Sequence, residues 1–189
     1  MKMFMIRHGE SEANFRKEHV GWGQVPLTEK GQEDARLAGE ILKNYSFDKV
    51  YSSDLIRAMQ TQKIALPNEV AELSELIREQ DVGRLSGKRF EDCETELGEM
   101  YLELRSIRDF RTFGGEDKPT HLERVKRFMD MLTTKNDQTV AVFAHAGTIY
   151  RAFDLSLPPD VERIFPKNCG IFLFEFDGEK WDFIKEITE

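Results

Sequence analysis

Two short apolar runs constrain the fold of this chain more than any other feature. Residues 140–144 read VAVFA, an uninterrupted run typical of a central strand that is buried on both faces of a parallel sheet. Residues 3–6 read MFMI and predict a second buried strand. Polar residues bound both runs, so neither approaches the roughly 18 apolar residues of a membrane-spanning helix. The first run is also shorter than the roughly 7 to 15 residues of a signal-peptide core.

Helices are expected to alternate with the strands. Thr28 predicts the N-cap of a helix whose apolar residues recur at spacings of three and four: Ala35, Ala38, Leu42 and Tyr45. Residues 9–26, before it, are expected to form a loop. Residues 48–51 predict another strand, and the cap residues 52–54 (SSD) are expected to open a helix that reaches about Ala65. This order predicts an α/β fold in which helices cover a mostly parallel sheet.

The middle of the chain has a different pattern. A short strand is expected at residues 76–78, and the turn-rich residues 83–87 (GRLSG) follow it. A polar helix then places five apolar residues on one face: Phe90, Cys93, Leu97, Leu104 and Ile107. A further helix is expected to begin at a capping box that starts with Thr120. We therefore predict a small helical cap insertion at about residues 84–116.

The end of the chain predicts an antiparallel edge for the sheet. Residues 171–176 and 181–187 are two apolar stretches that flank Asp177 and Gly178. A short Asp-Gly connection between two such stretches is typical of a β-hairpin.

The composition indicates one water-soluble domain over residues 1–189. Apolar residues make up 40% of the chain and charged residues 33%, which is enough hydrophobic material for a full core. The 27 basic and 35 acidic residues give a net charge of −8, which argues against nucleic acid or an anionic membrane as a partner. Cys93 and Cys169 lack CxxC spacing, so we expect unpaired core cysteines and a cytoplasmic protein, with one disulfide as the alternative.

Polar residues with chemical potential follow several of the expected strands. His8 and His145 each come directly after a strand and are followed by small residues, in RHG and HAG. Ligands of open α/β sheets bind at the carboxyl ends of strands, where small residues let backbone N–H groups approach an anion. Arg57 in the next helix and Arg7 are expected at the same rim, as is Glu79. Two guanidinium groups and two imidazoles would form a positive cavity suited to a tetrahedral phosphate.

Each of these residues also has a simpler interpretation. A histidine in a loop can bond a nearby carbonyl, Arg57 can pair with Asp54 on the surface, and Glu79 can be a solvated carboxylate. Two histidines and a glutamate could hold zinc, but Arg7 and Arg57 at the same point would repel a divalent cation. Residues 52–53 lack the glycines of a nucleophile elbow, and no dinucleotide or Walker fingerprint is present. We therefore expect no metal and no cofactor.

These motifs, taken in order, resemble the histidine phosphatase superfamily, which includes cofactor-dependent phosphoglycerate mutases and many small phosphatases. The matching positions are residues 4–11 (FMIRHGES), Asn14, 21–22 (GW), 26–31 (PLTEKG), 51–55 (YSSDL), 57–58 (RA), 60–61 (QT), Glu79 with Gly83, 114–116 (GGE) and His145. The resemblance covers about residues 4–151 and rests on far more than one tripeptide.

The resemblance implies a three-layer α/β/α sandwich with a helical cap and a site at the carboxyl ends of the strands. His8 would be the nucleophile that takes up the phosphoryl group, and Glu79 would be the proton donor to the leaving alcohol. The remaining positions that the resemblance marks as binding the substrate or its phosphoryl group are Arg7, Ser11, Asn14, Gly21, Arg57, His145 and the backbone N–H of Ala146.

Several departures bear on the substrate. Residues 83–87 lack the GxWEG pattern that small phosphatases of the family often carry, and Gln24, Asp117 and Ala146 stand where Asp, Ser and Gly are usual. The chain is also shorter than the mutases and lacks their paired cap arginines. Its nearest basic cap residues, at spacings of three, are Arg105, Arg108 and Arg111. They predict either one helical face that bears on the substrate or a solvated face paired with Glu103 and Asp109.

The sequence therefore predicts a phosphatase that hydrolyses a small phosphorylated metabolite through a phosphohistidine on His8. A phosphoglycerate mutase is the first alternative, and a non-catalytic phosphate-binding regulatory protein is the second. The identity of the metabolite stays open at this point. The protein is expected to be a monomer or a homodimer.

Overall fold

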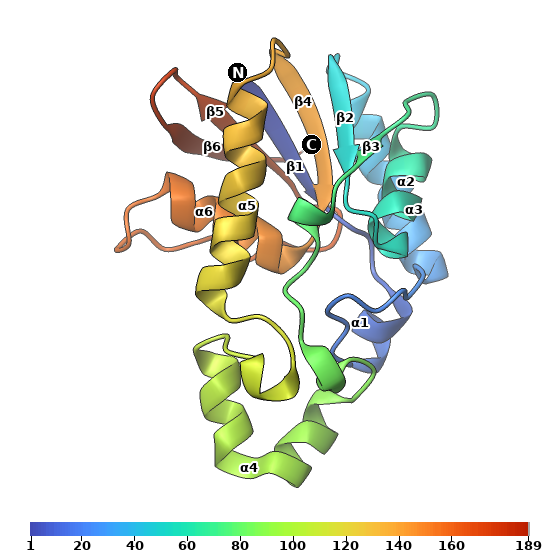
Figure 1. Ribbon diagram of the computed structural model, residues 1–189. Helices are drawn as coiled ribbons and strands as arrows, with labels where there is room; N and C mark the ends of the chain where they lie inside the picture. Colours follow the sequence, from blue (N-terminus) through green and yellow to red (C-terminus); the bar gives the residue numbers. More distant parts are fainter. Residues whose placement is uncertain (189) are drawn as a thin grey trace.

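A six-stranded sheet forms the centre of the structure, a computed structural model that describes residues 1–188 (Figure 1). The strand order is β3-β2-β4-β1-β5-β6. The first four of these strands run parallel, whereas β5 is antiparallel to β1 and β6 is antiparallel to β5. The bounds of the strands are β1 Lys2–Arg7, β2 Lys49–Ser52, β3 Glu72–Leu73, β4 Thr139–Ala144, β5 Ile171–Phe176 and β6 Trp181–Ile187. The expected parallel sheet with an antiparallel hairpin at its edge is confirmed.

Helices cover both faces of the sheet, as the three-layer prediction requires (Figure 1). On one face, α2 (Glu29–Leu42) and α3 (Ile56–Ala65) pack Ala38, Leu42 and Ala65 against alternate residues of β1, β2 and β4. On the other face, α5 (Lys118–Thr133) and α6 (Ala146–Ser156) contribute the larger apolar cluster, which includes Phe128 and Phe153. Burial on both faces accounts for the uninterrupted apolar runs of β1 and β4.

The segment expected to be a loop between β1 and α2 contains a short helix, α1 (Glu12–Arg16). Ser11 and Asn14 form its capping box: the Ser11 side chain accepts from the Asn14 N–H, and the Asn14 side chain accepts from the Ser11 N–H. The sequence prediction missed α1 because a five-residue helix carries too few apolar residues to show a period. The predicted N-cap of α2 is confirmed, since the Thr28 hydroxyl accepts from the Gly31 N–H at 3.0 Å.

Three predicted elements differ from the structure, one in its type and two in the residue at which they begin. The helix expected to open at residues 52–54 begins at Ile56, and Ser53 instead accepts from the N–H of Leu55 in a local turn. The strand expected at residues 76–78 is a 3₁₀-helix, η1 (Glu75–Ile77), so Glu79 does not follow a strand. The N-cap of α5 is Asp117, whose carboxylate accepts from the Thr120 N–H at 2.9 Å. Asp, Ser and Thr all suit caps and local turns, so composition alone cannot choose between neighbouring candidates.

The cap lies beyond the carboxyl ends of the parallel strands (Figure 1). It contains the 3₁₀-helices η2 (Gly83–Leu85) and η3 (Arg111–Phe113) and the helix α4 (Phe90–Ser106), which bends at Gly98, where φ is 58°. It has its own small apolar cluster: Val82, Leu85, Cys93, Tyr101, Phe110 and Phe113. Ile107, expected on the buried face of the helix, lies after its last turn and is 56% exposed.

Both cysteines are unpaired. Cys93 is buried in the cap cluster, and Cys169 is half-buried, with its backbone N–H donating to the carbonyl of Arg7 at 3.1 Å. Across the described residues, 1–188, no helix is long and apolar enough to cross a membrane.

Candidate active site

Four buried side chains converge where β1 and β4 end. Arg7 is the last residue of β1 and pairs in register with Ala144, the last residue of β4. The next residues, His8 and His145, therefore leave the sheet side by side, with ring centroids 5.2 Å apart. Arg57, in the first turn of α3, reaches them through its Nε, which donates to His8 Nε2 at 3.3 Å. The structure thus brings together the four residues that the sequence singled out.

The ring of His8 has a defined orientation and protonation. Its Nδ1 lies 2.7 Å from the carbonyl oxygen of Gly9, which can only accept, so Nδ1 carries the proton. The lone pair is then on Nε2, where Arg57 donates to it. Burial, together with the charges of Arg57 and Arg7, holds the pKa of His8 well below its usual value. His8 is therefore a neutral imidazole at pH 7, and its Nε2 lone pair accepts the long hydrogen bond from Arg57.

The two arginines are held by main-chain carbonyls. Arg57 donates to the carbonyls of Gly21 and Gly23, both at 2.9 Å, and Arg7 donates to that of Pro166 at 2.7 Å. Burial lowers the pKa of Arg57 to about 10, so its guanidinium stays charged at pH 7. Because neutral oxygens hold these groups, neither positive charge is neutralised by a carboxylate at hydrogen-bond distance.

Several buried polar atoms of this cluster lack a hydrogen-bond partner within residues 1–188. They are Nε of Arg7 and both ring nitrogens of His145. An unpaired buried polar atom costs about 1–3 kcal/mol, so such a group in an active site calls for a ligand atom. His145 is also the N-cap of α6, whose first backbone N–H groups and positive dipole end lie beside it. The arrangement is chemically suited to a tetrahedral anion.

Glu79 reaches the start of α6 from the segment that leads into the cap. Its Oε2 accepts from the N–H of Gly147 at 3.1 Å, and its Oε1 accepts from the N–H of Gln80 at 2.8 Å. A Cβ atom on Gly147 would lie 2.0 Å from Oε1, so only glycine lets the carboxyl group come this close to α6. The glycine of the second motif, HAG, thus lets the chain position Glu79 against the start of α6.

A cavity of about 140 Å³ connects these groups with the cap. Its wall on the sheet side consists of Arg7, His8, Asn14, Gly21, Arg57 and Glu79. Its wall on the cap side includes His19, Val82, Phe90, Arg108 and Phe110. In the described part of the chain, no group of three His, Cys, Asp or Glu side chains is placed to hold a metal ion.

Comparison with known proteins agrees with this geometry. The family model for the histidine phosphatase superfamily (branch 1) matches residues 3–186. The chain belongs to this superfamily.

Its relatives within the superfamily carry more than one activity in their names. The 2,3-bisphosphoglycerate-dependent phosphoglycerate mutase 2 of Gloeobacter violaceus is 30% identical, over 94% of this chain and 86% of the relative. A phosphoglycerate mutase structure from Bacillus anthracis superposes with a TM-score of 0.87 at 22% identity, covering 97% and 91% of the two chains. The alpha-ribazole phosphatase of Shigella flexneri gives 0.84 at 24%, covering 97% and 95%. These two structures share the fold.

Three residues of the predicted site are not part of the cavity wall: Ser11, His145 and Ala146. His145 is fully buried beside His8. The hydroxyl of Ser11 donates to Asn14 at 2.9 Å and caps α1, so its role here is to orient Asn14, which does line the cavity. Ala146 is the first residue of α6 and lies between His145 and Gly147. Its side chain is not part of the cavity wall, whereas its backbone belongs to the helix end that faces the cluster.

The three cap arginines have three different environments. Arg105 lies over the ring of Phe90, 4.7 Å from its centroid, and Arg111 pairs with Asp109 and Asp117. Only Arg108 lines the cavity, and it does so from a residue with a φ of 58° after the end of α4. The expected shared helical face is wrong, because the helix ends at Ser106. The expected pairing of an exposed cap arginine with Asp109 is confirmed for Arg111.

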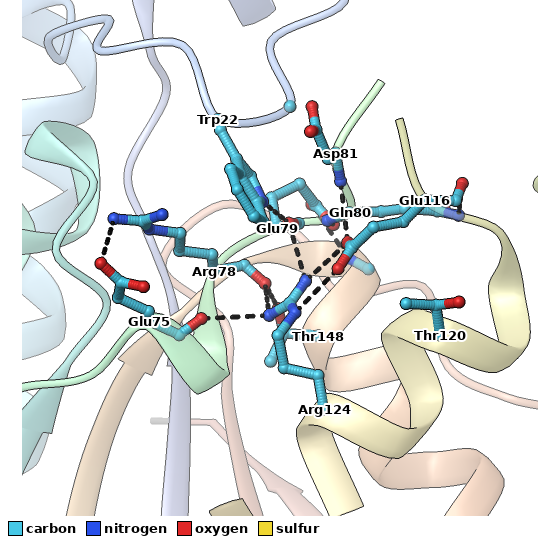
Figure 2. A network of polar contacts seen from close by, with 12 residues as sticks. Trp22, Glu75, Arg78, Glu79, Gln80, Asp81, Glu116, Thr120, Arg124 and Thr148 are labelled. Carbon is cyan, nitrogen blue, oxygen red and sulfur yellow. Dashed lines mark hydrogen bonds and ion pairs between the residues drawn. The ribbon is translucent and has the colours of Figure 1, made fainter. Parts of the chain in front are cut away.

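Arg124 anchors the segment that carries Glu79 (Figure 2). Its guanidinium donates to the carbonyls of Leu76, Arg78 and Glu79 at 3.0, 2.9 and 3.1 Å, and to the carboxylate of Glu116 at 2.8 Å. Glu116 in turn accepts from the N–H of Asp81. Glu116 belongs to the GGE motif of the sequence, whereas Arg124 lies in an ordinary amphipathic helix and gives no local signal of its role.

We expect Arg124→Met to reduce the free energy of unfolding by about 3 kcal/mol, because it leaves Glu116 and several carbonyls without their donor. Arg127→Met on the exposed side of the same helix is the matched control and should change stability by less than about 0.5 kcal/mol. Urea unfolding followed by circular dichroism measures both. Equal effects of the two substitutions would contradict the anchoring role.

The stability of the protein should also decrease as the pH falls below about 6.5. Burial and neighbouring cations hold the pKa values of His8, His121 and His145 well below that of a free histidine. The unfolded chain therefore binds more protons than the folded chain in this range, which favours unfolding. Urea unfolding at several pH values between about 7 and 5 measures the slope. His121→Gln should make the slope shallower, and an unchanged slope would be inconsistent with a neutral buried His121.

Proposed function

We propose that this protein is a phosphatase that hydrolyses a small phosphorylated metabolite through a phosphohistidine on His8. The observation that carries the proposal is the state of His8: a neutral ring with its lone pair on Nε2, which lines a cavity with two buried guanidinium groups. A neutral imidazole is a competent nucleophile at pH 7. Phosphoryl transfer otherwise needs positioning and positive charge around the phosphoryl oxygens, and Arg7 and Arg57 supply that charge. His145, a neutral ring beside His8, can add a hydrogen bond to one of these oxygens.

In the first step, Nε2 of His8 attacks the phosphorus and the P–O bond to the alcohol breaks. Glu79, in its protonated form, gives its proton to the departing oxygen, so the product leaves as a neutral alcohol. The phosphorylated ring retains its Nδ1 proton, and the carbonyl of Gly9 stabilises the positive charge that this ring acquires. The two arginines bind the non-bridging oxygens while the bonds exchange.

In the second step, water attacks the phosphorus of the phosphohistidine. The carboxylate of Glu79, formed in the first step, takes a proton from this water, and the P–N bond breaks. Inorganic phosphate leaves, and His8 returns to its neutral form with the lone pair on Nε2. The chemistry needs no redox partner, and each proton is accounted for by Glu79.

A phosphoglycerate mutase is the second candidate, favoured by the names of the relatives. A mutase returns the phosphoryl group to an alcohol instead of to water, so it must hold the acceptor in place. The small size of the chain is a weak argument against it, because the match spans 86% of a mutase of Gloeobacter violaceus. The cap offers the better argument: Arg105 and Arg111 have other partners, and Arg108 alone reaches the cavity.

The proposal is tested by trapping the intermediate. The protein is incubated with an ester that is labelled at phosphorus and is then denatured without acid. We expect label on the wild-type chain and none on His8→Ala, because the P–N bond forms at this residue. Label that persists on His8→Ala would contradict the nucleophile. Conversion of 3-phosphoglycerate to 2-phosphoglycerate with a bisphosphate primer, faster than release of phosphate, would favour the mutase. Binding of phosphate without turnover would favour a regulatory protein.

Glu79→Gln should slow the hydrolysis of alkyl phosphates by about a hundredfold or more, since the departing alkoxide then lacks its proton donor. The loss should be much smaller for p-nitrophenyl phosphate, whose leaving group needs little protonation. The ratio of the two rate constants is the measurement. Glu75→Gln, on the same segment but with its carboxylate on Arg78, is the control. An equal loss on both esters would contradict the proton-donor role.

A further inference from the structure

The cap end of the cavity holds a histidine that the mechanism does not use. His19 is 7% exposed and stands between aromatic rings, edge-on to Phe90, Tyr101 and Phe110 at centroid distances of 4.6, 5.7 and 6.0 Å. Its Nε2 lies 2.6 Å from the hydroxyl of Tyr101 on α4. His19 lines the same cavity as His8 and Glu79.

The direction of the proton in this pair follows from its surroundings. Burial raises the pKa of Tyr101, so the phenol keeps its proton, and burial with the charges of Arg105 and Arg108 lowers the pKa of His19 to about 4. The separation of 2.6 Å between Nε2 and the phenol oxygen is typical of an O–H donor and shorter than the roughly 2.7–3.2 Å of an N–H donor, so the phenol O–H donates to Nε2 of His19. The remaining proton of the neutral ring is then on Nδ1.

Nδ1 of His19 is free to bind something in the cavity. It has no hydrogen-bond partner within residues 1–188. Unlike the ring nitrogens of His145, it is not sealed from solvent. A buried ring that is fixed through one nitrogen and lines a cavity is a preorganised donor. Arg108 also lines this cavity, as does Glu18, whose carboxylate is paired with Arg16.

We propose that His19, held by Tyr101, selects the alcohol part of the substrate by donating a hydrogen bond from Nδ1 to an acceptor oxygen on it. This inference rests on the proposed phosphatase function, because it describes the leaving group of that reaction. The favoured substrates are phosphate esters of compact alcohols that carry a hydroxyl, carbonyl or carboxylate oxygen. Phe90 and Phe110 contact the apolar side of such an alcohol, and Arg108 disfavours one that carries an ammonium group.

The test compares glycerol 3-phosphate with n-propyl phosphate, which have the same carbon chain and differ in their hydroxyl oxygens. The readout is the ratio of kcat/KM for the two esters. We expect His19→Phe, which keeps an aromatic ring in place, to reduce this ratio about threefold to tenfold, as expected for one neutral hydrogen bond. Tyr45→Phe, on a tyrosine packed against Phe4 away from the cavity, is the matched control.

A ratio that does not change in His19→Phe would overturn the inference. A purely structural role of His19 would lower kcat/KM for both esters together and give that same unchanged ratio. Tyr101→Phe should reduce the ratio by no more than His19→Phe does. Because Tyr101 acts through His19, it should have no further effect in the double variant. A further loss in the double variant would also overturn the inference.

Binding to the His8→Ala variant separates this inference from the proposed function. Calorimetry with the two esters gives the ratio of their dissociation constants without turnover. A threefold to tenfold preference for glycerol 3-phosphate that disappears in His8→Ala/His19→Phe supports the role of His19, even if the wild-type chain releases no phosphate. If His8→Ala and His8→Ala/His19→Phe give the same ratio of dissociation constants while hydrolysis depends on His8, the phosphatase function is supported and the role of His19 is contradicted. O-phosphoethanolamine should bind more weakly than either ester, and tighter binding would contradict the role given to Arg108.

Discussion

The register between β1 and β4 is the constraint on which the site depends. Arg7 pairs with Ala144, so the two strands end at the same level and the next residue of each is a histidine. A shift of one residue would turn the side chains of a strand to the opposite face. It would also remove the buried packing of Met3, Met5, Val140 and Val142 in the larger apolar cluster. The energy that fixes the core thus also fixes the 5.2 Å separation of the two imidazole rings.

This scaffold carries a substantial electrostatic cost at its rim. Arg7 and Arg57 are buried without a carboxylate at hydrogen-bond distance, and burial lowers the pKa of each. Carbonyls of Gly21, Gly23 and Pro166 offset part of this cost, since they orient the guanidinium groups without neutralising them. A carboxylate partner would have made the chain more stable and the cavity less attractive to an anion. An acidic protein with a net charge of −8 can therefore contain a strongly positive cavity.

The sequence predicts a residue's place well where that place depends on the residue's own strand. It predicts it badly where the place depends on packing between distant segments. Apolar runs predicted β1, β4 and the β5–β6 hairpin, and the motifs that follow β1 and β4 predicted the cluster of His8 and His145. The 3₁₀-helix before Glu79 was taken for a strand, because residues 75–77 have no regular period and are held by Arg124 from α5. His19 was missed for the same reason. It lies in a segment without a period, and its partner Tyr101 is 82 residues away.

The division of the cavity explains why family membership and substrate are separate questions for this chain. The residues that line the sheet side of the cavity come from motifs whose spacing is set by strands and helix starts, so they can be predicted from the sequence. Residues on the cap side come from a bent helix, from a left-handed residue at Arg108 and from contacts within a small cluster. The cap is joined to the sheet by the segment that carries Glu79, which Arg124 holds in place. A change in the cap can therefore alter the alcohol that is recognised while the proton donor stays fixed.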